Sequence, residues 1–190
     1  MAATADNTPS LTVSRLFRIA WFLLSPFPTR RVGPTRARLL RLVGADIGEG
    51  VTFGPGVRLI APHRLVIGSR TRIARDATID ARAGVEIGPN TMIGFEAVVL
   101  SETHRFEDPD QPVRDQGMEG RPVRIGSNAW LGARVFVLPG RNVGNNAIVG
   151  ASSVVTRDVD PNTIVAGNPA KLVRERDPGE LTPAVDELPE

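Results

Sequence analysis

The chain has 190 residues, of which 41% are hydrophobic and 23% charged, a balance typical of one soluble domain with short extra ends. It contains 19 Gly and 16 Pro but no Tyr and no Cys, which excludes disulfide frameworks, thiolate metal sites and a cysteine nucleophile. The formal net charge is only +2, and the arginines are scattered without interleaved aromatic residues, so the composition argues against nucleic-acid binding.

The N-terminal part contains a short apolar run. Residues 1–14 are predicted to be disordered, and residues 15–44 to form a helical segment. The run 19–24 is too short to cross a bilayer and lacks a small-residue cleavage site, so we expect a cytoplasmic protein whose helix packs on the rest of the fold. The alternative is an interfacial helix, in peripheral contact with the inner face of the membrane through residues 15–31. In that case the arginines at the lipid head groups would be Arg15, Arg18, Arg30 and Arg31.

Hydrophobic residues, aliphatic at every position but Phe53, recur at six-residue steps in five triplets within residues 45–170. Two extra residues enter between the first and second triplets and again between the second and third, so that these three coils start at positions 47, 67 and 87. A long insertion, 101–124, precedes the last two triplets, which run at strict spacing. The fifteen positions are Ile47, Phe53, Leu59, Ile67, Ile73, Ile79, Ile87, Ile93, Val99, Ile125, Leu131, Val137, Val143, Val149 and Val155.

A spacing of six suits short strands that turn one side chain inward, and it does not fit a helix of 3.6 residues per turn. Gly, Asn, Asp and Pro follow many of these positions and are the residues that turn a chain. Three strands per turn make a triangular solenoid, whose coils hydrogen-bond to one another at about 4.8 Å. We therefore predict an all-β fold, a parallel β-helix of about five triangular coils. A sandwich of short strands would show no fixed triplet frame.

The two segments outside the repeat differ in character. The insertion 101–124 is long and polar, as is typical of a functional loop on a rigid stack. Residues 171–190 form a C-terminal extension ending in an acidic tail with few apolar residues, and we predict that this tail is disordered.

Five motifs give the chain a resemblance to a known family: "LLRLVGADIG", "THRFEDPDQPV", "PVRIGSNAWLGARVFVLPG", "VGASSVVTRDV" and "IVAGNPAKLVRER". Over roughly residues 39–176 the sequence resembles the hexapeptide-repeat acyltransferases, in particular the bacterial O-acetyltransferases of sugars and polysaccharides that include maltose and galactoside acetyltransferases. The resemblance implies a left-handed β-helix, a homotrimer and transfer of an acetyl group from acetyl-CoA, with no metal. Outward apolar side chains that need cover, at Trp130, Phe136 and Phe95, also favour a trimer.

His104, in the insertion, is the candidate general base. A neutral imidazole can remove the proton of a hydroxyl as its oxygen attacks a thioester, and the resemblance implies this role for a histidine in this loop. The absence of Cys and of a serine-elbow motif favours direct attack without an acyl-enzyme. The other histidine, His63, is expected to be structural or superficial. Many maltose-type relatives carry an asparagine where Ala74 stands, which leaves three candidates for the residue that orients the acceptor: Asp76, Asp80 and Glu102.

For the donor, the resemblance implies a groove between neighbouring subunits, with the pantetheine arm of acetyl-CoA along coils four and five. Trp130 precedes the inward Leu131, so its ring is expected to face outward and to pack along that arm, the alternative being ordinary interface packing. Lys171 and Arg174 would meet the coenzyme phosphates as cations. The remaining coenzyme-binding candidates are Ala133, Ala151, Ser152 and Thr156.

Three other functions remain to be weighed. A zinc site like that of the γ-type carbonic anhydrases needs three histidines, and the chain has two. Transfer to the amine of an amino sugar or sugar nucleotide would use similar scaffolding. A non-catalytic scaffold would need neither the outward Trp130 nor His104.

Overall fold

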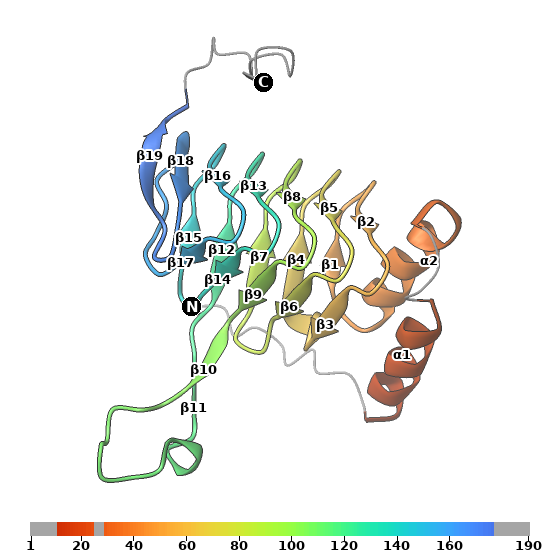
Figure 1. Cartoon of the computed structure of the whole chain (residues 1–190). Coiled ribbons are helices and arrows are strands. Elements are labelled where there is room, and N and C mark those ends of the chain that lie inside the picture. The colour runs from red at the N-terminus through yellow and green to blue at the C-terminus, as the bar shows by residue number, and fades with distance from the viewer. Residues whose placement is uncertain (1–10, 25–28, 177–190) are drawn as a thin grey trace, which may run out of the picture.

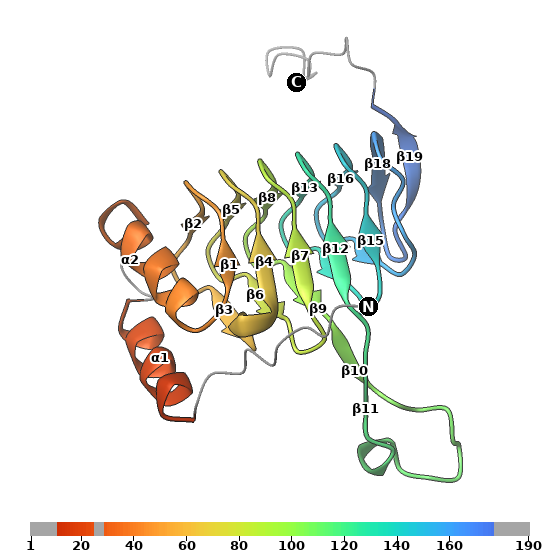
Figure 2. The same cartoon turned by 180° about the vertical axis from the view of Figure 1, so that it is seen from behind.

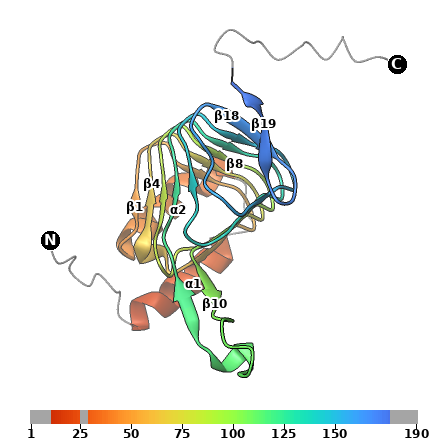
Figure 3. The ribbon, with the colours of Figure 1, turned by 90° about the vertical axis from the view of Figure 1, so that its left-hand side faces the viewer.

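The protein is a parallel β-solenoid capped by two helices at its N-terminal end (Figure 1). This architecture comes from a computed structural model that describes residues 11–24 and 29–176. The solenoid has three flat sheets, here called A, B and C, which the chain visits in that order in each turn. Viewed along its axis, the stack is triangular (Figure 3).

Each sheet contains one short strand from each successive turn. Sheet A contains β1 (Asp46–Ile47), β4 (Leu65–Ile67), β7 (Val85–Ile87), β12 (Val123–Ile125) and β15 (Asn142–Val143). Sheet B contains β2 (Thr52–Phe53), β5 (Arg72–Ile73), β8 (Met92–Ile93), β13 (Trp130–Leu131), β16 (Ile148–Val149), β18 (Thr163–Ala166) and β19 (Lys171–Glu175). Sheet C contains β3 (Arg58–Ile60), β6 (Thr78–Asp80), β9 (Val98–Leu100), β14 (Phe136–Val137) and β17 (Val154–Val155).

The register of these strands confirms the six-residue frame. In sheet A, Ile47 pairs with Ile67 and Ile67 with Ile87. In sheet B, Phe53 pairs with Ile73. Fourteen of the fifteen predicted inward residues are buried, and Leu59 is partly buried against the same core. The core is therefore one narrow column of aliphatic side chains along the solenoid axis.

The solenoid has a sixth turn that the sequence reading missed, so the predicted number of about five coils was too low. Val159 bridges to Val143 at the end of sheet A, and β18 follows in sheet B, where Val165 pairs with Val149. Val159 and Val165 are six residues apart and both are buried, so the frame continues. It was hidden because the step from Val155 to Val159 is four residues rather than six or eight.

The corners depend on residues in the left-handed region of backbone conformation. The third residue after the inward position has a positive φ at the A–B corner of several turns, as at Arg70 (58°), Asn90 (60°) and Asn146 (60°). Asparagine tolerates this conformation better than most residues. At this corner the asparagine side chains also form a ladder, in which Asn128 donates to Asn146 and Asn146 donates to Asn162, both at 2.9 Å.

Two helices cover the open end of the first turn, α1 (Leu11–Leu24) and α2 (Thr29–Leu42) (Figures 1 and 2). The indole Nε1 of Trp21 donates to the carbonyl oxygen of Val57 at 2.8 Å, and its ring meets that of Phe53 edge to face at 5.7 Å. The buried guanidinium of Arg36 in α2 donates to the Phe53 carbonyl oxygen at 2.6 Å, and burial lowers the pKa of this group. The prediction that a helix packs on the rest of the fold is thus confirmed for one face of α1.

The boundaries of the terminal segments differ from those predicted. Helix α1 begins at Leu11 rather than at residue 15, so residues 11–14 are helical and not disordered. Among the described residues no helix is long and apolar enough to span a membrane. Residues 1–10 and the acidic tail from residue 177 lie outside the described residues, as do the side chains of Arg15, Arg18, Arg30 and Arg31.

Two segments depart from the regular coil. The insertion is an antiparallel hairpin of β10 (Glu102–His104) and β11 (Met118–Gly120), which leaves the solenoid at the C–A corner (Figure 1). Sheet A resumes at Val123, slightly before the predicted end of the insertion at residue 124. The C-terminal extension begins with β19, which pairs antiparallel with β18 and covers the last turn of sheet B.

Candidate functional site

His104 is the last residue of β10 and lies opposite Met118 across the hairpin. The backbone N–H of Arg105 donates to the carbonyl oxygen of Gly117 at 3.1 Å, which continues the ladder beyond the histidine. His104 is exposed. The hairpin therefore holds this imidazole away from the core, where a second molecule can reach it.

The face of the hairpin that carries His104 meets the solenoid at its base. Glu102 and His104 are two residues apart on one strand and so share a face. Glu102 lies opposite Gly120, and a Cβ built on Gly120 would be only 2.7 Å from the Cβ of Ala83. Gly120 is therefore required for this close approach to the C–A corner of the solenoid.

A cluster of three charged side chains lies at this junction. The Nη1 of Arg82 is 3.0 Å from Oδ2 of Asp80 and 3.1 Å from Oε2 of Glu102. The backbone N–H of Arg82 also donates to Oδ1 of Asp80 at 3.1 Å. Asp80 is buried and Glu102 largely so, whereas Arg82 is half-exposed. One cation thus contacts two of the three carboxylates considered as the residue that orients the acceptor.

The third carboxylate candidate lies elsewhere. Asp76 is at the B–C corner of turn two, where it adopts a positive φ of 59°. Ala74 is at the same corner, and its N–H donates to the carbonyl oxygen of Ile93 in the next turn. Asp76 and Ala74 are therefore at the B–C corner, whereas the hairpin of the same chain leaves the solenoid at the C–A corner.

Several coenzyme candidates lie together along the edge where sheets B and C meet, here called the B–C edge. The backbone N–H of Ser152 donates to the carbonyl oxygen of Ala133 at 2.8 Å, so these residues belong to neighbouring turns of the edge. Ala151 and Ser152 are exposed, and Ala133 is partly so. Next to this edge, a Cβ built on Gly132 would be 2.6 Å from the backbone nitrogen of Ala151. Gly132 thus lets the next turn stack closely, and the side chains of Ala133, Ala151 and Ser152 at this edge are all small.

Trp130 lies beside this edge and faces outward from sheet B, as predicted. Its side chain is 47% exposed, although Leu131 next to it is fully buried. In register it lies between Met92 of turn three and Ile148 of turn five, and Ile148 in turn precedes Ile164 of turn six. The outer face of sheet B therefore carries an apolar column from turn three to turn six, whereas Thr52 and Arg72 occupy this column in the first two turns.

Lys171 continues the B–C edge at the C-terminal end of the solenoid. It pairs with Ala166, whose Cβ would be 3.0 Å from a Cβ built on Gly150. Lys171 also lines a cavity whose other charged residues are Arg157, Asp158 and Asp160. Hydrogen bonds from the side-chain amide and backbone N–H of Asn142 lower the pKa of Asp158, so this carboxylate is anionic at neutral pH. The cations here are thus partly offset by acidic neighbours.

Two of the predicted coenzyme residues are not brought to this group. Arg174 lies toward the opposite end of β19, where its register partner is Ile164 and its guanidinium contacts the carbonyl oxygen of Glu175 at 3.2 Å. Thr156 follows β17 and is therefore at the C–A corner of turn five. The group formed on the B–C edge consists of Trp130, Ala133, Ala151, Ser152 and Lys171.

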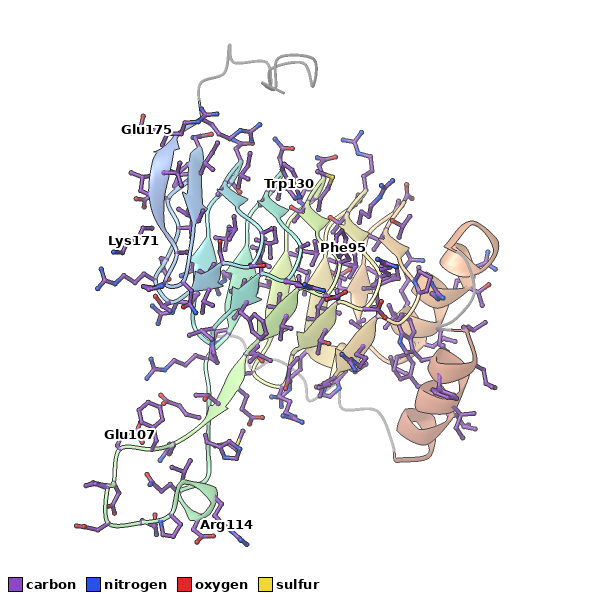
Figure 4. All side chains as sticks on the ribbon, viewed as in Figure 1. Phe95, Glu107, Arg114, Trp130, Lys171 and Glu175 are labelled. Carbon is purple, nitrogen blue, oxygen red and sulfur yellow. The ribbon has the colours of Figure 1, made fainter. Side chains whose placement is uncertain are left out.

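His104 and this group lie on opposite sides of one chain. Trp130 is at the upper side in Figure 4, whereas the labelled residues of the hairpin, Glu107 and Arg114, are at the lower side. Viewed along the axis, β10 extends from one corner of the triangle and β19 lies across from it (Figure 3). The two halves of the predicted site are therefore not assembled within a single chain.

Charged pairs on the B–C edge and at the hairpin were not found by sequence reasoning. Nε of Arg134 is 2.6 Å from Oε2 of Glu96, and this hydrogen bond lowers the pKa of Glu96 and raises that of Arg134. Arg75 lies over the ring of Phe95, 5.5 Å from its centroid. The repeat frame carried a signal for each of these contacts. Arg82 and Glu102 are separated by the 20 residues of one early coil, as are Arg75 and Phe95. Glu96 and Arg134 each follow an inward residue of paired strands by three positions.

No group of three or more His, Asp or Glu side chains that could hold a metal ion occurs within the described part of the chain. The site is thus built from an exposed imidazole, a carboxylate–guanidinium cluster and an open backbone edge beside an aromatic ring.

Comparison with known proteins gives a consistent result. Residues 122–157 match the family model "Bacterial transferase hexapeptide (six repeats)". Over 141 residues the chain is 33% identical to WcaF of Escherichia coli K12, named as a candidate colanic acid biosynthesis acetyltransferase, covering 74% of this chain and 75% of WcaF. It is 31% identical to the galactoside O-acetyltransferase of the same organism, covering 74% of this chain and 68% of that enzyme.

A solved structure supports the fold assignment. The structure of a galactoside acetyltransferase in complex with coenzyme A superposes with a TM-score of 0.77 at 25% identity, covering 93% of this chain and 86% of the other. The solenoid is accordingly the left-handed parallel β-helix predicted from the motifs.

Proposed function

Because the chain belongs to the hexapeptide-repeat acyltransferases, we propose that it transfers an acetyl group from acetyl-CoA to a hydroxyl of a sugar or glycan, with His104 as the general base. Membership of this family, and the acetyltransferase class that goes with it, confirm the predictions made from the motifs. The acceptor class is supported by the names of the relatives, and the role of each residue by the geometry of the site.

The observation that carries the proposal is the composition of the B–C edge. Trp130 offers an outward aromatic face beside the alanine corners of turns four and five, and Lys171 follows at the end of the same edge. A long, mostly apolar pantetheine arm can lie along such an edge and donate to or accept from its backbone. The Lys171 ammonium then provides a cation for the phosphates.

In the proposed reaction, the imidazole of His104 is the general base for attack of the acceptor hydroxyl on acetyl-CoA. One ring nitrogen accepts the proton of the acceptor hydroxyl while the oxygen attacks the thioester carbonyl carbon. The tetrahedral species collapses by breaking the C–S bond, and the imidazolium returns its proton to the leaving thiolate. The chain contains no Cys, so we propose direct transfer with both substrates bound.

The proposed site needs two copies of the chain, because His104 and the B–C edge lie on opposite sides of one molecule. In a homotrimer, the hairpin of one subunit would face the B–C edge of its neighbour. Cover for the exposed side chains of Trp130, Phe95 and Phe136 is a second reason to propose a trimer.

Incubation with labelled acetyl-CoA and a panel of acceptors tests this function. We expect label in an ester on oligosaccharides that carry free hydroxyls, recognised by its release in alkali. Label retained as an alkali-stable amide, on amino sugars alone, would replace this proposal with N-acetyl transfer. Absence of transfer to any acceptor, together with no binding of acetyl-CoA, would favour a non-catalytic scaffold.

A further inference from the structure

Helix α1 has two apolar faces, and the fold uses only one of them. Phe17 and Trp21 are buried against the first turn of the solenoid and stack on each other at 5.7 Å. The opposite face is formed by apolar side chains that touch little of the described chain. These are Leu16 (62% exposed), Ile19 (59%), Phe22 (78%) and Leu23 (61%).

The spacing of these four residues makes them one stripe. Steps of three, three and one residues place them on one side of a helix, away from the side that carries Phe17 and Trp21. Single exposed apolar residues are ordinary on a protein surface, but a contiguous stripe on one helix indicates an interaction surface.

The charge of this region indicates the partner. Residues 7–45 contain seven arginines and not one Asp or Glu, in a chain whose overall net charge is only +2. Two of these arginines, at positions 15 and 18, each precede a residue of the stripe, Ile19 or Phe22, by one helical turn. An apolar stripe in a stretch of sequence whose charged residues are all arginines fits a membrane surface, which is apolar beneath a layer of anionic head groups.

We propose that the exposed face of α1, formed by Leu16, Ile19, Phe22 and Leu23, binds the surface of a membrane that contains anionic lipids. Apolar side chains enter the boundary between head groups and acyl chains, and the arginines lie near the lipid phosphates. The buried face of the same helix keeps it attached to the solenoid through Trp21 and Phe17. Both alternatives considered for this segment then hold, each for one face of the helix.

A second copy of the chain fits this surface less well. A two-fold contact would place the same patch against itself and bring its arginines together without any acidic residue to offset them. Helix α1, which carries the stripe, also lies at the end of the solenoid opposite β19 (Figures 1 and 2), so the inference is independent of the proposed acetyl transfer.

Sedimentation with vesicles tests the inference on the full-length protein. Wild type should sediment with vesicles of phosphatidylcholine and phosphatidylglycerol, bind phosphatidylcholine alone much less, and dissociate as salt is raised. The double variant Phe22→Ser/Leu23→Ser should lower the partition coefficient by roughly tenfold or more, because two exposed apolar side chains no longer enter the bilayer. Val66→Ser is the matched control, since Val66 is exposed on the outer face of β4, away from α1.

Thermal unfolding and light scattering complete the design. Both variants should melt as wild type does, because the substituted side chains are exposed. Wild type that binds no vesicles, or a double variant that binds as tightly as wild type, would overturn the proposal. A double variant that forms smaller oligomers while neither protein binds lipid would assign the stripe to contacts between copies.

Discussion

The inward side chains of the solenoid are single residues with large consequences, because the core is only one column wide. Ile73 and Ile93 are fully buried and pair in adjacent turns of sheet B. Arg75, two residues after Ile73, instead lies outside over the ring of Phe95. Positions two residues apart should therefore differ sharply in how much stability a charged substitution costs.

Ile73→Asp should destabilise the protein by about 3 kcal/mol or more, since it buries a carboxylate without a partner and removes packed methyl groups. Arg75→Asp should cost at most about 1 kcal/mol, the scale of an exposed cation–π contact. Chemical denaturation of both variants measures the difference. Equal losses of unfolding free energy at the two positions would contradict the register.

Arg82 contacts both Asp80 and Glu102, and residue types alone did not predict this cluster. Asp80 and Glu102 were candidates for orienting the acceptor because Ala74 stands where many maltose-type relatives carry an asparagine. Their shared contact with Arg82 became visible only in the fold, although the 20-residue coil length already aligned Arg82 with Glu102. Charge pairs one coil apart are a signal that can be sought in any sequence with this repeat.

The elements of the site differ in how strongly their sequences specify them. The B–C edge follows from the hexapeptide frame, which places Trp130 outward and the alanine corners in successive turns. The hairpin β10–β11 has no such frame, because its residues are polar and its pairing depends on the close approach of Gly120 to Ala83. Its antiparallel pairing was accordingly not predicted.

For the B–C edge, Trp130→Ala and Lys171→Ala should each raise the KM for acetyl-CoA more than the KM for the acceptor. Both side chains are assigned to the coenzyme, and neither is needed for the core. Val66→Ala, outward on sheet A, should change neither constant. Calorimetry that shows undiminished coenzyme affinity in both variants would remove these residues from the donor site.

On the scale of the whole molecule, most of the architecture could be predicted from the sequence. The period of six specified the triangular solenoid, because each inward position has the same environment in every turn. The sixth turn and the start of α1 were missed, since a four-residue step breaks the frame at Val159 and the first helical turn carries no periodic signal of its own. The separation of His104 from the B–C edge depends on topology, so residue types could not show it.

That separation predicts complementation between inactive variants. His104→Ala lacks the base, and Ala151→Trp places a bulky ring on the B–C edge where the coenzyme arm is proposed to lie. When the two variants are produced in equal amounts and assemble at random into trimers, roughly one quarter of all sites should combine an intact hairpin with an intact neighbouring edge. Coexpression should therefore restore partial activity. Light scattering that gives a monomer mass, or a mixture as inactive as either variant, would contradict a site shared between subunits.

The central claim is that His104 removes the proton of the acceptor hydroxyl, and the turnover of His104→Ala with acetyl-CoA and a verified acceptor tests it most directly. We predict a fall in kcat of roughly 10²-fold or more, the scale of general-base catalysis, with the binding of acetyl-CoA and thermal stability unchanged. His63→Ala should be close to wild type. Full turnover by the folded His104→Ala variant would contradict the account.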